Sequence, residues 1–171
     1  MALPIIWLGA AALATYTGVK YANRLNSEEY GFAAHPGELD CTVTPVSGSI
    51  VCCEVYDVLD HSGVWVGDRI IELNGNGLVR SVSPERFLHD RSGNTIYVAC
   101  DDDLAPVVFD GADQRASESI FQYRQYDLLK NNCHTFVSEM VSSQSSAVTL
   151  FRDLNQQLAQ QHGQNITWLP V

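Results

Sequence analysis

Hydrophobic and polar positions divide the chain into an apolar N-terminal stretch, a polar connection and a longer patterned region. Residues 3–22 are uncharged except for Lys20, and their number is about that needed to span a bilayer as a helix. Residues 26–45 are polar and contain glycine and proline, a composition typical of a linker or loop. The pattern predicts an N-terminal hydrophobic helix over residues 1–25, followed by one folded domain.

The first half of the patterned region has the composition of β-strands. Gly67 and Asp68 form a tight-turn signal between two strand-like runs, residues 61–66 and 70–74. Other strands are expected at residues 49–59, 78–82 and 95–100, with a short helical turn at residues 84–89. These runs predict a small antiparallel sheet.

The second half of the region has helical spacing. Residues 116–126 and 148–162 are expected to be helices, the latter amphipathic with apolar side chains along one side. Asn131 and Asn132 are good N-cap residues, and they precede a further helix over residues 133–142. Strands followed by helices favour an α+β fold, with the sheet packed on the helices.

The residues around the N-terminal helix bear on its topology and association. Lys20 and Arg24 follow its apolar part, so the rest of a membrane-anchored chain is expected in the cytoplasm. Ala10, Ala14 and Gly18 form a row of small residues through which two copies could pair into a homo-oligomer. A cleaved signal peptide is an alternative, although no basic region precedes the apolar part. A helix packed within the folded protein is another.

Composition excludes several classes of function. The 171-residue chain has a net charge of -10, so it lacks the basic surface that nucleic acid binding requires. Its five cysteines are odd in number and include no CxxC pair, which favours a reducing compartment. It contains neither a glycine-rich phosphate loop nor zinc-ligand spacing, and we expect no cofactor or metal.

Cys133 has a sequence context unlike that of the other cysteines. Because it follows Asn131 and Asn132, its thiol is expected in the first turn of a helix, where the helix dipole stabilises a thiolate. The N–H groups of the same turn can stabilise an oxyanion. A buried structural cysteine is the alternative. Three other cysteines fall within strand-like runs and are expected to be small core residues: Cys52, Cys53 and Cys100.

His61 is the candidate general base. It opens a predicted strand, and nearby Gly63 leaves room above the sheet. A histidine on a strand facing a cysteine on a helix is the arrangement that papain-like enzymes use. His134 adjoins Cys133 and is expected to point elsewhere, because consecutive helical residues do not face the same side.

Two residues are candidates for orienting His61. If Gly67 and Asp68 form a two-residue turn, Asn74 lies directly opposite His61, and Glu72 lies diagonally opposite it on the same face. Either side chain could hold the imidazole in the required tautomer. A solvent-facing acid is the alternative for Glu72.

Two segments resemble motifs of the lecithin retinol acyltransferase family. HSGVWVGD at residues 61–68 is similar to the family's H-x-G-I-Y-x-G-D motif. NCHTFV at residues 132–137 is similar to its N-C-E-H-F-V motif, and the likeness covers roughly residues 36–142. The family is a circularly permuted branch of the NlpC-type papain-like superfamily, in which the histidine precedes the cysteine, as it does here.

The resemblance implies a permuted papain-like fold, with Cys133 as the nucleophile that becomes acylated and His61 as the base. The sequence departs from the family pattern at two places. Glu72 replaces a second histidine and is one residue closer to the turn, which fits a Cys-His-acid triad. His134 and Thr135 replace the Glu-His pair that follows the family's cysteine. These departures leave the substrate open.

The sequence thus predicts a single-pass membrane enzyme that uses Cys133 to cleave or transfer the acyl group of a lipid ester or amide. Its expected parts are a membrane anchor at residues 1–25, a papain-like catalytic domain at residues 26–146, and an amphipathic helix with a tail at residues 147–171. The alternatives are a cysteine peptidase or amidase of the same superfamily, and a non-catalytic binding module tethered to a membrane.

Overall fold

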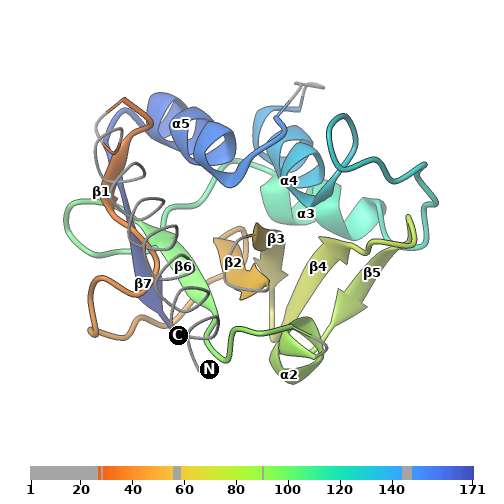
Figure 1. The fold of residues 1–171 in the computed structure, drawn as a ribbon, viewed down its shortest axis with the longest axis horizontal. Helices are drawn as coiled ribbons and strands as arrows, with labels where there is room; N and C mark the ends of the chain where they lie inside the picture. The colour runs from red at the N-terminus through yellow and green to blue at the C-terminus, as the bar shows by residue number, and fades with distance from the viewer. Residues whose placement is uncertain (1–26, 28, 56–58, 90, 144–147) are drawn as a thin grey trace, which may run out of the picture.

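The computed structural model describes residues 27, 29–55, 59–89, 91–143 and 148–171. They form an α+β fold around a seven-stranded sheet with the strand order β1-β7-β6-β2-β3-β4-β5 (Figure 1). β1 and β7 are parallel, and the other neighbouring strands are antiparallel. The strands are β1 (Phe32–Ala34), β2 (Ile50–Val55), β3 (Leu59–Val66), β4 (Arg69–Leu73), β5 (Val79–Val82), β6 (Tyr97–Cys100) and β7 (Ile166–Pro170).

The prediction of a small antiparallel sheet is wrong, because β1 and β7 enlarge the sheet and make it mixed. Phe32 lies opposite Ile166 in their parallel pairing, and β7 also pairs with β6. β1 has three residues, too few for a recognisable alternation of polar and apolar positions. β7 follows a helix in a segment that was predicted to be a tail.

Helices pack on both faces of the sheet. They are α2 (Pro84–Leu88), α3 (Ala112–Glu118), α4 (Cys133–Ser142) and α5 (Phe151–His162). Figure 1 shows α3, α4 and α5 together on one side of the sheet, and α2 on the other side beside β4 and β5. Phe136 of α4 and Leu154 of α5 belong to one buried cluster, and Phe87 of α2 belongs to the other. Each face of the sheet therefore has its own hydrophobic core.

The predicted hairpin and the helix that begins at Cys133 are confirmed. Val66 lies opposite Arg69 across the turn, the register expected from a two-residue connection. The helix runs from Cys133 to Ser142, and the Asn132 side chain accepts a hydrogen bond from the backbone N–H of Thr135 at 3.0 Å. This is an N-cap, which satisfies one of the free N–H groups of the first turn.

The helix predicted over residues 116–126 is wrong in its position. α3 begins at Ala112 and ends at Glu118. Phe121 has a φ of 71°, outside the right-handed helical region, and its N–H donates to the carbonyl of Val79 in β5. Backbone pairing with the edge strand therefore replaces the helical hydrogen bonds from Phe121 onward.

The membrane helix predicted over residues 1–25 lies outside the described residues. Among the helices that the structure does describe, none has the length and apolar character needed to cross a membrane. At the other end of the chain, residues 147–171 contribute α5 and β7, and β7 lies between β1 and β6 in the sheet.

Candidate active site

Cys133 is the first residue of α4 and is 4% exposed. Its position is set by Asn132, which caps the helix through its side-chain oxygen. The side-chain amide of Asn132 also donates to the carbonyls of Leu128 and Thr149, at 2.8 Å each. The start of the helix is therefore tied to the loops on both sides of α4, and this fixes the place of the thiol.

His61 lies on β3 and is held by Glu72 of β4. The distance from His61 Nε2 to Glu72 Oε2 is 2.6 Å, and the imidazole ring also packs against Phe87 at 5.1 Å between ring centres. Cys133 lies near enough to His61 for its charge and hydrogen bonding to raise the pKa of the imidazole. Because an imidazole has two nitrogens and Glu72 takes Nε2, the nitrogen that serves the thiol is Nδ1.

Glu72 is fully buried and compensated by two arginines. Arg80 Nε donates to Oε1 at 2.8 Å, and Arg91 Nη2 donates to Oε2 at 3.0 Å. Burial raises the pKa of Glu72. The hydrogen bond and charge of His61 and the two guanidinium groups have the larger, opposite effect, and the resulting pKa is about 2. The carboxylate is therefore ionised at neutral pH and can orient the imidazole.

Of the two residues proposed to orient His61, the structure brings Glu72 to the ring. Asn74 follows the last residue of β4, and its backbone N–H donates to the carbonyl of Leu78 in the β4–β5 turn. Its side chain lines a cavity together with Arg80 and Arg91. Asn74 therefore belongs to the surroundings of the buried carboxylate, and Glu72 is the hydrogen-bond partner of Nε2.

The electrostatic surroundings favour a thiolate paired with an imidazolium. Burial raises the pKa of the Cys133 thiol, but the charges and hydrogen bonds of His134 and His61 bring that pKa well below its ordinary value. Burial lowers the pKa of His61, but Cys133 and Glu72 act in the opposite direction, and the net shift is upward. The two shifts have the same cause, because each charged partner stabilises the other.

His134 also reaches the thiol, and the expectation that it points elsewhere is wrong. Its charge and hydrogen bonding help to lower the pKa of the Cys133 thiol, while His134 Nδ1 lies 2.9 Å from the hydroxyl of Ser62. The rule for consecutive residues applies along a helix, whereas Cys133 is the first helical residue and its thiol lies at the open end. His61 and Ser62 are neighbours on β3, and their side chains point to opposite faces of the sheet. The residues of the site therefore come from both faces of this strand.

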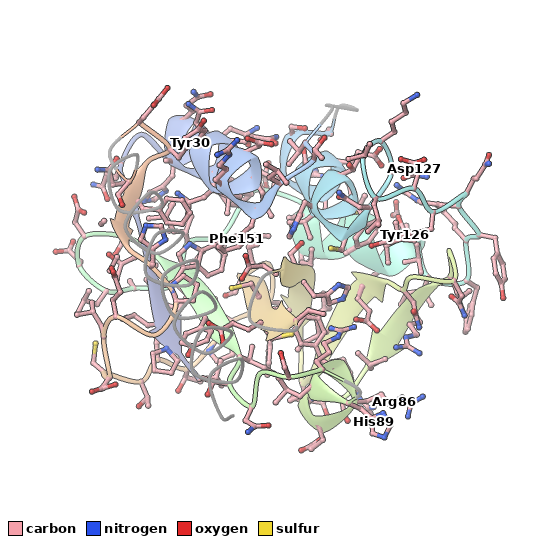
Figure 2. The ribbon with its side chains drawn as sticks, in the orientation of Figure 1. Tyr30, Arg86, His89, Tyr126, Asp127 and Phe151 are labelled. Atoms are coloured by element: carbon pink, nitrogen blue, oxygen red, sulfur yellow. The ribbon has the colours of Figure 1, made fainter. Side chains whose placement is uncertain are left out.

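Two further side chains close to the thiol were not identified from the sequence. Tyr126 lies on the loop before α4 (Figure 2), and its hydroxyl is near enough to Cys133 for that residue to affect the pKa of the phenol. Burial, followed by the nearby Cys133 charge, raises the pKa of Tyr126 to about 12. Burial likewise raises the pKa of Asp60, on β3, to about 6, although the charge of His134 opposes the shift.

Arg80 and Arg91 were also not identified from the sequence, although the position of Arg80 could have been predicted. Arg80 is the cross-strand neighbour of Glu72 in the β4–β5 pairing, so a predicted register for this second hairpin would have placed the pair together. Arg91 follows α2 and carries no such signal, because its approach to Glu72 depends on how α2 packs against the sheet.

No protein-family model matches this chain, and no curated protein matches it.

Proposed function

We propose that the protein is a cysteine-dependent acyl hydrolase or acyltransferase that acts on a lipid ester or amide. The observation that carries the proposal is the place of Cys133 at the start of α4 near His61, whose Nε2 lies 2.6 Å from the buried carboxylate of Glu72. The lowered pKa of the Cys133 thiol supports the same assignment. A nucleophile, a base and a group that orients the base are the three parts of a thiol acyl-transfer site.

The reaction proceeds in two steps. The Cys133 thiolate attacks the carbonyl carbon, a C–S bond forms, and the bond from that carbon to the leaving oxygen or nitrogen breaks. His61 gives its Nδ1 proton to the leaving group, so an alcohol or amine departs and a thioester remains on Cys133. In the second step His61 takes a proton from water or an amine, which attacks the thioester and restores the thiolate.

Donors for the oxyanion are present beside the thiol. The hydroxyl of Tyr126 lies near Cys133 at the start of α4, and the N-terminal end of the helix favours negative charge. The backbone N–H of Cys133 interacts with that hydroxyl, so it would serve an oxyanion once Tyr126 moves. The N–H of Thr135 is taken by Asn132, so it is not available for this purpose. Cys133 is 4% exposed, which implies that the half-buried Tyr126 side chain moves when a substrate enters.

A lipid is the substrate class that we favour, with the reaction taking place at a membrane surface. The loop that precedes Cys133 carries large apolar side chains that are more than half exposed: Phe121, Tyr123, Leu128 and Leu129. The apolar sequence of residues 3–22 supports the same location. A membrane would cover these side chains and bring acyl chains near Cys133.

The test is to trap the acyl-enzyme. The full chain would be incubated separately with a phospholipid, an activated short-chain ester and a peptide, quenched in acid, and measured by intact mass and peptide mapping. We expect an acyl adduct on Cys133 with the phospholipid and the ester, and none in Cys133→Ala. An adduct from the peptide alone would favour a peptidase, and no adduct from any of the three would contradict the proposal.

A further inference from the structure

A cavity of about 240 Å³ lies on the α2 side of the sheet, close to Glu72. It is lined by Asn74, Arg80, Arg86, His89 and Arg91. Figure 2 shows Arg86 and His89 at the end of the molecule formed by α2, and both residues are exposed. The cavity is thus open to solvent on the side of Arg86, and it has room for several water molecules.

The described residues that line this cavity carry an excess of positive charge. Three of them are arginines, and the carboxylate that two of these arginines contact belongs to Glu72. Among the described residues around the cavity, three guanidinium groups accompany one carboxylate. The described side chains around the cavity are therefore mainly basic, whereas the chain as a whole has a net charge of -10.

The hydrogen-bonding capacity of the guanidinium groups exceeds what Glu72 uses. Each guanidinium has five N–H donors. Arg80 directs Nε and Nη2 to Glu72, and Arg91 directs Nη2 to it. Nη1 of Arg91 donates to the Cys53 sulfur at 3.7 Å, and the side chains of Arg80 and Arg91 are 26% and 13% exposed. The donors left over belong mainly to Arg80 and to Arg86, which lines the cavity from α2.

Glu85, the acidic residue next to Arg86 in α2, has partners of its own. Its carboxyl group accepts a hydrogen bond from Ser83 and lies near Arg69. Ser83 is the N-cap of α2, and this holds Glu85 at the start of the helix. Arg86 is therefore the third charge of the cavity, and it is exposed to ligands from solvent.

We propose that this cavity is a binding site for a phosphate-type oxyanion. A tetrahedral anion with several acceptor oxygens suits guanidinium groups that approach from β5, α2 and the segment after α2, with the Asn74 amide as a further neutral donor. The anion would be the phosphate of a lipid headgroup or free phosphate, which share this chemistry. Binding there requires no reaction at Cys133, so the inference goes beyond the proposed function.

The site would lie next to the proposed catalytic group. Glu72 separates the arginines from His61, because its Oε2 contacts both His61 and Arg91. The cavity is therefore reached from the α2 side, while the thiol lies at the start of α4. A bound phosphate would share Arg80 and Arg91 with Glu72. It would therefore contact the same arginines that hold the carboxylate next to His61.

Binding would be measured by calorimetry on the full chain at low ionic strength, with inorganic phosphate and with glycerol 3-phosphate as separate titrants. We expect one site in the wild type. Arg86→Glu should weaken phosphate binding by about tenfold or more, and Arg86→Gln by less, because hydrogen bonds to a charged group are strong. Arg69→Glu is the matched control, since it changes the charge equally at an exposed position outside the cavity.

The outcomes separate the sources and the two proposals. Tighter binding of glycerol 3-phosphate than of phosphate would indicate a lipid headgroup, and equal binding would indicate the free ion. Absence of binding in the wild type, or equal weakening by Arg86→Glu and Arg69→Glu, would overturn the inference. Cys133→Ala should bind phosphate as the wild type does, so failure of the acyl-enzyme test would leave this result intact.

Discussion

Two regions of the molecule bury cysteines with opposite consequences. At the start of α4, Cys133 is 4% exposed and its pKa is well below the ordinary value. In the middle of the sheet, Cys52 and Cys53 of β2 are fully buried, and burial raises the pKa of both. Burial acts in the same direction on all three thiols, so it cannot explain the difference.

The neighbouring charges explain it. Cys133 lies between two imidazoles, and their charges and hydrogen bonds overcome the effect of burial. Burial raises the pKa of Cys53 to about 12; the Arg91 charge opposes the shift, but Glu72, Asp60 and Cys133 add to it. A buried thiol is thus reactive only where the chain provides cationic partners within reach.

The largest expected difference is between Cys133 and Cys53 in the wild type. At pH 7, alkylation of Cys133 should be faster than that of Cys53 by about a thousandfold or more, because a thiol with a pKa of about 12 is almost wholly protonated. Peptide mapping by mass spectrometry after timed alkylation would measure both rates. Exposed Cys41 provides an internal reference. Comparable rates for Cys133 and Cys53 would remove the distinction between the two regions.

His61→Ala should make Cys133 more like the strand cysteines. We expect acyl-enzyme formation to fall by about a hundredfold or more, because the variant lacks the base. Alkylation of Cys133 between pH 5 and 9 should also shift toward higher pH, since one of the two imidazoles that lower its pKa is lost. His162→Ala is the control outside the site.

His134→Ala should shift the pH dependence of Cys133 alkylation and should retain acyl-enzyme formation. If acyl-enzyme formation were also lost in this variant, His134 would be the base instead of His61.

Glu72→Gln tests the fixed part of the site. Removal of this buried carboxylate leaves Arg80 and Arg91 without their partner and should lower the free energy of unfolding by about 3 kcal/mol. The exposed control Glu118→Gln should change it by less than about 0.5 kcal/mol. Urea denaturation would measure both values. A wild-type value for Glu72→Gln would mean that the carboxylate does not hold the site together.

The stabilising effect of Glu72 should also depend on pH in a defined direction. The folded pKa of Glu72, about 2, lies below that of an unfolded glutamate. The contribution is therefore complete above the unfolded pKa of about 4.3, and it is lost as the pH falls through the folded value. The denaturation midpoint of the wild type should fall between pH 4 and 2 more steeply than that of Glu72→Gln.

Tyr126→Phe should have the smallest effect. The variant loses the hydroxyl near the Cys133 thiol, so the thiolate is less stable and the thiol pKa should rise by less than about one unit. The pH dependence of Cys133 alkylation would show this as a rate a few times lower near pH 6. Tyr123→Phe, at a position that is 75% exposed, is the matched control. An unchanged profile would exclude Tyr126 as a donor to the thiolate.

Local patterns were sufficient where the interaction itself is local. Asn132 before Cys133 predicted the capped start of α4, and Gly67 with Asp68 predicted the β3–β4 turn and its register. That register is enough to place Glu72 on the same face of the sheet as His61. Backbone hydrogen bonds within one turn or one hairpin depend on a few adjacent residues, and a sequence pattern records them directly.

The elements that were wrong or missed depend on distant partners. β1 and β7 are 134 positions apart in their pairing of Phe32 with Ile166, and Phe121 and Gln122 leave the helical conformation and bond to Val79 of β5. The contact of His134 with Ser62 spans 72 positions. None of these contacts has a periodic signal, because each forms only when separate elements pack together.

By itself, the sequence determined that a cysteine would begin a capped helix, that a histidine would occupy a strand, and that Glu72 or Asn74 would lie beside that histidine. Only the tertiary structure decided between Glu72 and Asn74, because Arg80 and Arg91 arrive from β5 and from the segment after α2 to stabilise a fully buried carboxylate. It also brought His134 to the thiol. The physical reason is the cost of burying charge, which is offset only where opposite charges from separate elements converge.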